Sequence, residues 1–217
     1  MADLVISPHL DDAVFSLGQY LAGHPGTAVA TVFAGRPEGA TTGIWDHRCG
    51  FADGREAMAA RRAEDIEALA VLRCEAVHLD FFDLQYGRPA TDDEIGDAIR
   101  LLISELQPST VLGPVGLVHP DHQQVGRVWP RIARRYASAS IAYEELPYRV
   151  QFPALATAAV GTLVSVGATA VAADRGGLDE KTHAIGAYRS QLAVMDPALC
   201  LHPERLWSLP DLPAPGA

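Results

Sequence analysis

The chain has 217 residues, of which 48% are hydrophobic and 20% are charged, a composition typical of a soluble globular domain and not of a disordered or fibrous chain. Its formal net charge of −10, with no cluster of Lys and Arg, argues against nucleic acid as a partner, because the field repels polyphosphates. Three cysteines without paired spacing predict no disulfide framework, and the first residues lack the pattern of a secretory signal. We therefore expect a reducing, cytoplasmic location.

Short apolar runs alternate with helical patterns along the first 140 residues or so. Apolar residues recur at helical spacing after each run, and Thr91 with Glu94 forms the sequence signature of a capping box. We expect strands over 4–8, 27–33, 76–79 and 111–113 and helices over 11–22, 55–72 and 91–106. This order predicts an α/β fold, a Rossmann-like three-layer domain with a mostly parallel sheet and right-handed crossovers.

Two further segments complete the predicted domain. Residues 35–53 are rich in Gly, Pro and Thr and too long for a simple connection, so we regard them as a candidate lid, with Trp45 either in the lid or anchoring it. Residues 154–173 carry no charge over 20 positions, the length of a membrane helix, but Ala, Gly and Thr dominate them. We predict no membrane span, and two short strands around a turn within 162–173.

A single domain over 1–217 accommodates all of these elements. Its Rossmann-like core covers about 1–145, and a C-terminal extension with short strands and a helix covers about 146–208.

Two motifs of His and Asp follow predicted strands. The first is His9-Leu10-Asp11-Asp12 and the second is His119-Pro120-Asp121-His122. Ligands of open α/β sheets bind at the carboxyl ends of the strands, and zinc in catalytic sites takes three imidazole or carboxylate ligands and keeps one position open. Helix capping would explain either motif alone. The two motifs together, at matching strand ends, favour a metal site.

These motifs resemble those of the PIG-L or LmbE-like N-acetylglucosamine deacetylases. In that family the first motif reads His-Pro-Asp-Asp-Glu, whereas Leu10 stands here for Pro and Ala13 for the acidic residue. The second motif is intact. Residues 61–64 resemble the Arg-x-x-Glu of the family, and residues 181–191 resemble its late Lys…Ser-Gln signature. The resemblance covers most of the chain.

The resemblance implies a metal site and a catalytic base. It assigns His9, Asp12 and His122 to one zinc ion per chain, with other divalent metals as alternatives. It assigns Asp11 to the general base. This assignment of Asp11 to the base and of the other three residues to the metal agrees with zinc chemistry, because a carboxylate that is not a ligand can take the proton of the attacking water.

The same resemblance implies roles for five more residues. His119 would stabilise the oxyanion or protonate the leaving amine, with Asp121 on its other nitrogen, and such a carboxylate partner is expected to raise the pKa of the imidazole. Arg61, Asp83 and Tyr86 would bind substrate. Alternatively, Arg61 pairs with acidic residues of its own helix, and Asp83 and Tyr86 cap a loop.

The implied function is zinc-dependent removal of an N-acyl group, foremost N-acetyl, from an amino sugar, a glycoconjugate or another sugar-containing natural product.

Three alternatives stay open. A dinucleotide-binding enzyme is disfavoured, because the turn over 7–12 has no glycine and two carboxylates that would repel a pyrophosphate. Another metal-dependent hydrolase would cleave a phosphoester or the amide of a thiol-sugar conjugate. A non-catalytic sugar-binding module would need neither Asp11 nor His119. The oligomeric state, a homo-oligomer included, is left open.

Overall fold

One seven-stranded sheet runs through the molecule, which is described here from a computed structural model over residues 2–38, 41–87, 89–173 and 176–211. The strands are β1 (Leu4–Ser7), β2 (Ala28–Thr31), β3 (Glu75–His78), β4 (Thr110–Pro114), β5 (Ala139–Tyr143), β6 (Thr169–Val171) and β7 (Leu206–Ser208). They lie in the order β3-β2-β1-β4-β5-β7-β6. The first five pair in parallel, and β7 pairs antiparallel to both β5 and β6. The predicted α/β fold with a mostly parallel sheet is confirmed.

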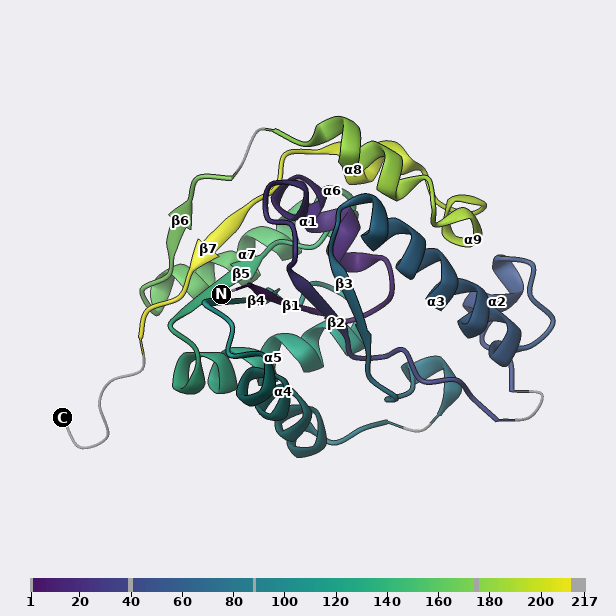
Figure 1. Cartoon of the computed structure of the whole chain (residues 1–217), viewed down its shortest axis with the longest axis horizontal. Helices are drawn as coiled ribbons and strands as arrows, with labels where there is room; N and C mark the ends of the chain where they lie inside the picture. Colours follow the sequence, from purple (N-terminus) through teal and green to yellow (C-terminus); the bar gives the residue numbers. More distant parts are fainter. Residues whose placement is uncertain (1, 39–40, 88, 174–175, 212–217) are drawn as a thin grey trace.

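Helices cover both faces of this sheet. The α-helices are α1 (Asp12–Gly23), α2 (Ile44–Arg48), α3 (Gly54–Val71), α4 (Asp92–Leu106), α5 (Pro120–Tyr136), α6 (Tyr148–Gln151), α7 (Pro153–Ser165), α8 (Leu178–Ile185) and α9 (Arg189–Leu192), and the 3-10 helices are η1 (Leu84–Tyr86) and η2 (Pro197–Leu201). Figure 1 shows α4 and α5 on one face and α1, α3 and α8 on the other, which makes three layers.

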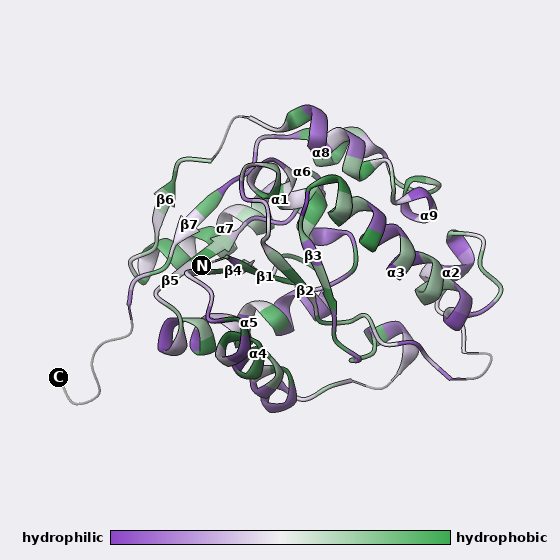
Figure 2. Ribbon diagram, viewed as in Figure 1, coloured by the Kyte–Doolittle hydropathy of each residue, from purple (hydrophilic) through white to green (hydrophobic). Residues whose placement is uncertain are grey.

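Two apolar cores lie between these layers. Leu4 and Ile6 of β1 belong to the core beneath α4 and α5, whereas Val5 belongs to the core beneath α1, α3 and α8. This alternation follows from the two-residue period of a strand. Because the central strands are buried on both faces, their sequences are mostly apolar, as the green colouring of β1 and β4 shows (Figure 2).

The chain reverses its direction of travel across the sheet between β1 and β4. These two strands are neighbours, but β1 leads to β2 on one side and β4 leads to β5 on the other. Open α/β sheets bind their ligands at such a point, because the connections diverge and leave a crevice beyond the carboxyl ends of the strands. Both His-Asp motifs follow these two strands.

Helix α1 is interrupted at Leu17, whose φ of −130° and ψ of 16° are not helical. A buried ion pair stabilises the part of the helix that follows. The carboxylate of Glu204 accepts hydrogen bonds from the backbone N–H groups of residues 19–20, at 2.8 and 3.0 Å. Lys181 Nζ donates to the same carboxylate at 2.8 Å, and both side chains are fully buried. A Cβ atom on Gly18 would collide with the side chain of Lys181, so this position needs glycine. The C-terminal extension thus supports the first helix.

The prediction of two short strands within 162–173 is wrong in part. Helix α7 runs from Pro153 to Ser165, and only β6 forms a strand. Proline at the first helical position and the Ala- and Leu-rich composition favour the helix, which ends where Gly167 takes a positive φ of 97°. Within the ranges described, the chain has no helix both long and apolar enough to cross a membrane.

The predicted loop over 35–53 contains a helix, α2, which the sequence reading missed; residues 39–40 of this loop lie outside the described ranges. Trp45 of α2 donates a hydrogen bond from Nε1 to Gln191 Oε1 at 2.7 Å. This contact joins α2 to α9, and it gives Gln191 of the late Lys…Ser-Gln signature a structural partner. Helix α5 and strand β5 were also absent from the predicted elements.

We predict that Lys181→Ala lowers the free energy of unfolding by about 3–5 kcal/mol, because it leaves the buried Glu204 carboxylate without its cationic partner. Urea denaturation followed by circular dichroism measures this loss. Arg100→Ala is the control, since its pair with Asp97 is largely exposed and such pairs contribute about 0–1 kcal/mol. An equally small loss for Lys181→Ala would show that the backbone N–H groups alone satisfy Glu204.

Candidate metal centre

The turn after β1 presents the first motif. The hydroxyl of Ser7 donates to the His9 carbonyl oxygen at 2.7 Å and accepts from the Ala13 N–H at 3.1 Å, which closes the turn. The backbone N–H of His9 donates to Asp12 Oδ2 at 2.9 Å. Ala13, in place of the acidic residue of the resembling family, is buried in the core around α1. The second motif forms the first turn of α5, with His119 as the N-cap.

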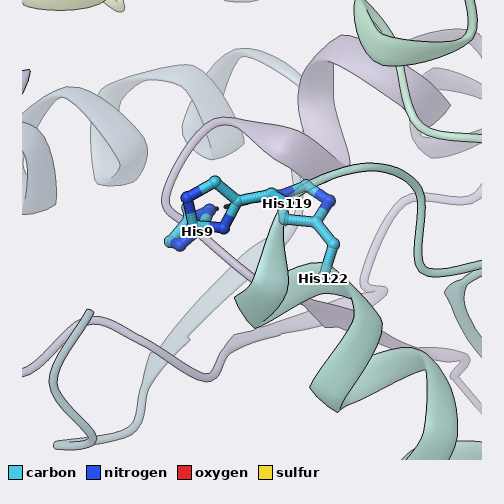
Figure 3. Close-up of side chains that lie close together, drawn as sticks. All are labelled: His9, His119 and His122. Atoms are coloured by element: carbon cyan, nitrogen blue, oxygen red, sulfur yellow. Dashed lines mark hydrogen bonds between the residues drawn. The ribbon is translucent and has the colours of Figure 1, made fainter. Parts of the chain in front are cut away.

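Three potential ligand atoms meet between the two motifs. His122 Nε2 lies 3.0 Å from Asp12 Oδ2 and 3.2 Å from His9 Nδ1, and the latter lies 3.3 Å from Asp12 Oδ2. A tetrahedral zinc with bonds of about 2.0–2.2 Å needs ligand atoms about 3.3–3.5 Å apart. The sides of this triangle, 3.0–3.3 Å, are up to about 0.3 Å shorter than the lower of these values, so a small outward shift of the side chains makes room for a zinc ion bound by two imidazoles and one carboxylate. Figure 3 shows the side chains of His9, His119 and His122 gathered at one place.

The other ring nitrogens of both histidines contact carboxylates. His9 Nε2 lies 3.0 Å from Asp121 Oδ2, and His122 Nδ1 lies 3.3 Å from Glu145 Oε1. Histidine ligands of metals usually donate their second N–H in this way, which fixes the tautomer and the orientation of the ring. Sequence reasoning missed Glu145. It follows β5, a strand that the reasoning also missed. The two adjacent glutamates at residues 144–145, after the end of a strand as both motifs are, could have identified it from the sequence.

The electrostatics of the triangle favour positive charge at its centre. Burial alone would lower the pKa of His122, but the charge and hydrogen bond of Asp12 raise it to about 9. Burial likewise opposes the charged form of His9, yet hydrogen bonds to Asp12 and Asp121 raise its pKa well above its ordinary value. Burial would raise the pKa of Asp12, but the two imidazoles hold it far below its ordinary range. A divalent cation would supply the positive charge that these side chains stabilise.

Asp11 stands at the start of α1 without capping it. It is the N-cap residue of α1, but its side chain makes no capping hydrogen bond. Burial and the charge of Asp12 raise the pKa of Asp11 to about 7, against the opposing charges of His9 and Arg61. A carboxylate with a pKa near neutrality can exchange a proton with a reacting group at physiological pH.

The predicted hydrogen bond between the His119 ring and the Asp121 carboxylate is not formed, and the two groups make only a long ion-pair contact. Asp121 Oδ2 lies 3.9 Å from His119 Nδ1 and instead contacts His9. His119 Nδ1 accepts a hydrogen bond from the backbone N–H of Asp121 at 3.3 Å, so the neutral ring carries its proton on Nε2. Burial and the positive charge of His9 lower the pKa of His119. The expectation that this pKa is raised is therefore wrong.

Of the three predicted substrate-binding residues, Arg61 and Tyr86 share the partner Asp46, and Asp83 lies near His9. Arg61 Nη2 pairs with Asp46 Oδ1 at 2.8 Å, and the Tyr86 hydroxyl donates to Asp46 Oδ2 at 3.0 Å. Asp46 belongs to α2 and is fully buried, so its contacts with Arg61 and Tyr86 hold this helix in place. Sequence reasoning did not identify Asp46 as their partner. Asp83 Oδ1 accepts from the backbone N–H two residues on, at 2.9 Å, and its Oδ2 lies 4.0 Å from His9 Nε2. Asp83 is therefore a loop cap that borders the centre.

Comparison with known proteins adds a family and a set of similar structures. The family model of PIG-L, described as GlcNAc-PI de-N-acetylase, matches residues 4–133. The A40926 pseudoaglycone deacetylase Dbv21 is 27% identical with a TM-score of 0.79, covering 96% of each chain. A deacetylase in complex with teicoplanin, from the teicoplanin biosynthesis pathway, is 26% identical with a TM-score of 0.75, covering 96% of this chain and 98% of that one.

The same fold also occurs in a protein of another activity. The 4-carboxy-2-hydroxymuconate hydratase GalB of Pseudomonas putida KT2440 is 19% identical with a TM-score of 0.68 and full coverage of both chains. At this identity the likeness concerns the fold alone, so function has to be argued from the site. Among the curated proteins, no sequence matches the chain.

We predict that the protein binds one zinc ion per chain and that His122→Ala loses it, because the variant removes one of three ligands. Elemental analysis after dialysis against zinc-free buffer measures the metal content. Asp11→Asn is the matched control and keeps the metal, since Asp11 lies outside the triangle. Loss of zinc from Asp11→Asn would instead place Asp11 among the ligands.

Proposed function

We propose a function for this chain on one premise: it belongs to the PIG-L family of GlcNAc-PI de-N-acetylases. On this premise the protein is a zinc-dependent hydrolase that removes an N-acetyl group from an amino sugar within a glycoconjugate or natural product. The observation that carries the proposal is the triangle of His9, Asp12 and His122 with Asp11 beside it. The similarity to deacetylases of A40926 pseudoaglycone and teicoplanin supports the substrate class.

The residues of the centre divide the chemistry among them. A zinc ion held by His9, Asp12 and His122 would polarise the amide carbonyl and lower the pKa of a water molecule toward about 7. Asp11 accepts the proton of the attacking water, because its own pKa of about 7 matches that task. Asp11 then delivers this proton to the nitrogen of the leaving amine, which is otherwise a poor leaving group.

His119 acts on the oxygen of the amide. Its Nδ1 is occupied by the backbone N–H of Asp121, so the proton on Nε2 is available for donation. The side chain is 34% exposed, which leaves it accessible to a substrate. A fixed N–H donor stabilises the negative charge that develops on the amide oxygen during attack. In this scheme His119 remains neutral and is not the acid of the reaction.

The part of the substrate beyond the amide has room beside the centre. A cavity of about 310 Å³ lies between the loop before η1 and the first turns of α5. Phe33, Phe82 and Leu84 give it apolar walls, and Asp121 and Arg127 line it as well. Apolar walls with a few polar groups are typical of small-molecule sites. Arg61, Asp83 and Tyr86 are proposed as further contacts to the sugar.

The experiment that tests the function is incubation of the zinc-loaded protein with a panel of N-acetyl amino sugars and glycoconjugates, followed by mass spectrometry. We expect loss of acetyl from a member of the panel. Asp11→Asn lowers kcat by at least about a hundredfold and keeps its zinc, because the variant removes the proton acceptor. Release of phosphate from phosphoesters, with no deacetylation across the panel, would contradict the proposal.

For His119→Ala we expect a drop in kcat of about 10²–10³-fold with little change in KM, since the donor acts on charge that develops in the transition state. His119→Gln recovers part of the rate, because its amide can donate a hydrogen bond. Steady-state kinetics at saturating zinc measures both variants. A His119→Ala enzyme with normal kcat would mean that the second motif serves only to present His122.

A further inference from the structure

Glu145 is a buried carboxylate that lies outside both His-Asp motifs. It follows β5, and its side chain is fully buried. Its Oε1 atom lies 3.3 Å from His122 Nδ1 and accepts hydrogen bonds from the backbone N–H groups of Gly116 and Leu117, at 2.8 and 2.7 Å. One oxygen atom thus contacts a metal ligand and the loop that leads to the second motif.

This loop has an unfavourable backbone conformation. Gly116 has a φ of 93°, and Val118, a β-branched residue, has a φ of 56°. Side chains branched at Cβ rarely adopt positive φ, and such conformations persist only where the surroundings enforce them. The two hydrogen bonds to Glu145 enforce the conformation from one side. Because His119 directly follows Val118, they also help to set where His119 lies.

The segment after β5 contacts His122 in a second way. The ring of Tyr148 packs edge to face against the imidazole of His122, with 4.9 Å between ring centroids. Glu144 points to other partners: its Oε1 accepts from Trp207 Nε1 at 2.9 Å, and its Oε2 lies 3.8 Å from Arg149 Nε. The two adjacent glutamates are both buried, but only Glu145 touches the metal centre.

We propose that Glu145 is a positioning residue of the metal centre, which fixes the proton of His122 on Nδ1, leaves Nε2 to the metal, and holds the loop before His119. The inference rests on the proposed metal-dependent function and extends it. A carboxylate on the second nitrogen also makes the imidazole a stronger ligand. The same carboxylate therefore ties metal affinity to the placement of His119.

The test compares Glu145→Ala and Glu145→Gln with Glu144→Gln as the matched control. Zinc affinity is measured by competition with a chromophoric chelator, and kcat and KM are measured at saturating zinc. We expect Glu145→Ala to bind zinc about 10–100-fold more weakly and to have a lower kcat even when saturated, because the loop before His119 is released. Glu145→Gln keeps an acceptor oxygen, so it recovers kcat but only part of the affinity. Glu144→Gln leaves both unchanged.

A second readout is the nitrogen NMR signal of the histidine rings in the zinc-loaded wild type and in Glu145→Gln. We expect His122 to show a protonated Nδ1 whose proton exchanges faster with solvent in the variant. If Glu145→Ala does not fold, Glu145→Gln decides the matter: zinc affinity equal to that of Glu144→Gln would overturn the proposal. A folded Glu145→Ala with wild-type affinity and kcat would overturn it too. A wild type that binds no zinc would instead refute the proposed function, and the role of Glu145 with it.

Discussion

The parallel pairing of β1 with β4 is the constraint on which the centre depends. Leu4 pairs with Val111 and Val5 with Leu112, so both strands end at the same edge of the sheet. The chain then leaves them toward opposite sides, which opens a crevice between the two following turns. As a result, two imidazoles 113 positions apart in the chain lie with ring nitrogens 3.2 Å from each other. The helices on both faces serve this pairing by burying the strands.

Within that crevice, three carboxylates surround two imidazoles. Asp12 contacts both rings from inside the triangle, Asp121 contacts His9 from behind, and Glu145 contacts His122 from behind. Buried carboxylates are unfavourable without partners, and here each has an imidazole, so the whole set favours a cation at its centre. Metal binding to this set would be coupled to folding, because the unfolded chain holds no such arrangement.

The sequence predicted what short-range patterns encode. The first four strands, the long helices between them and the capping box of α4 follow from local spacing, and the fold class is confirmed. The zinc ligands were assigned by the family resemblance and stay a prediction. The partner of Asp121 was mispredicted, because neighbours on a helix do not face each other, and the residue turns to His9. Glu145 and Asp46 went unnoticed, since their partners lie far away in sequence. Two strands were predicted within 162–173 where a helix end and one strand occur, because uncharged small residues fit either a helix or a strand.

The link between Glu204 and α1 has a consequence for how the protein is made. Helix α1 begins with Asp12, a proposed ligand, yet the carboxylate that accepts hydrogen bonds from the backbone of its second half stands 185 positions after Gln19 in the chain. At about 5–20 residues per second on the ribosome, roughly 10–40 seconds pass between the two. During translation, the first motif therefore emerges long before its supporting helix can be completed. The turn that carries His9 and Asp12 gains the full support of α1 only after Glu204 has been synthesised.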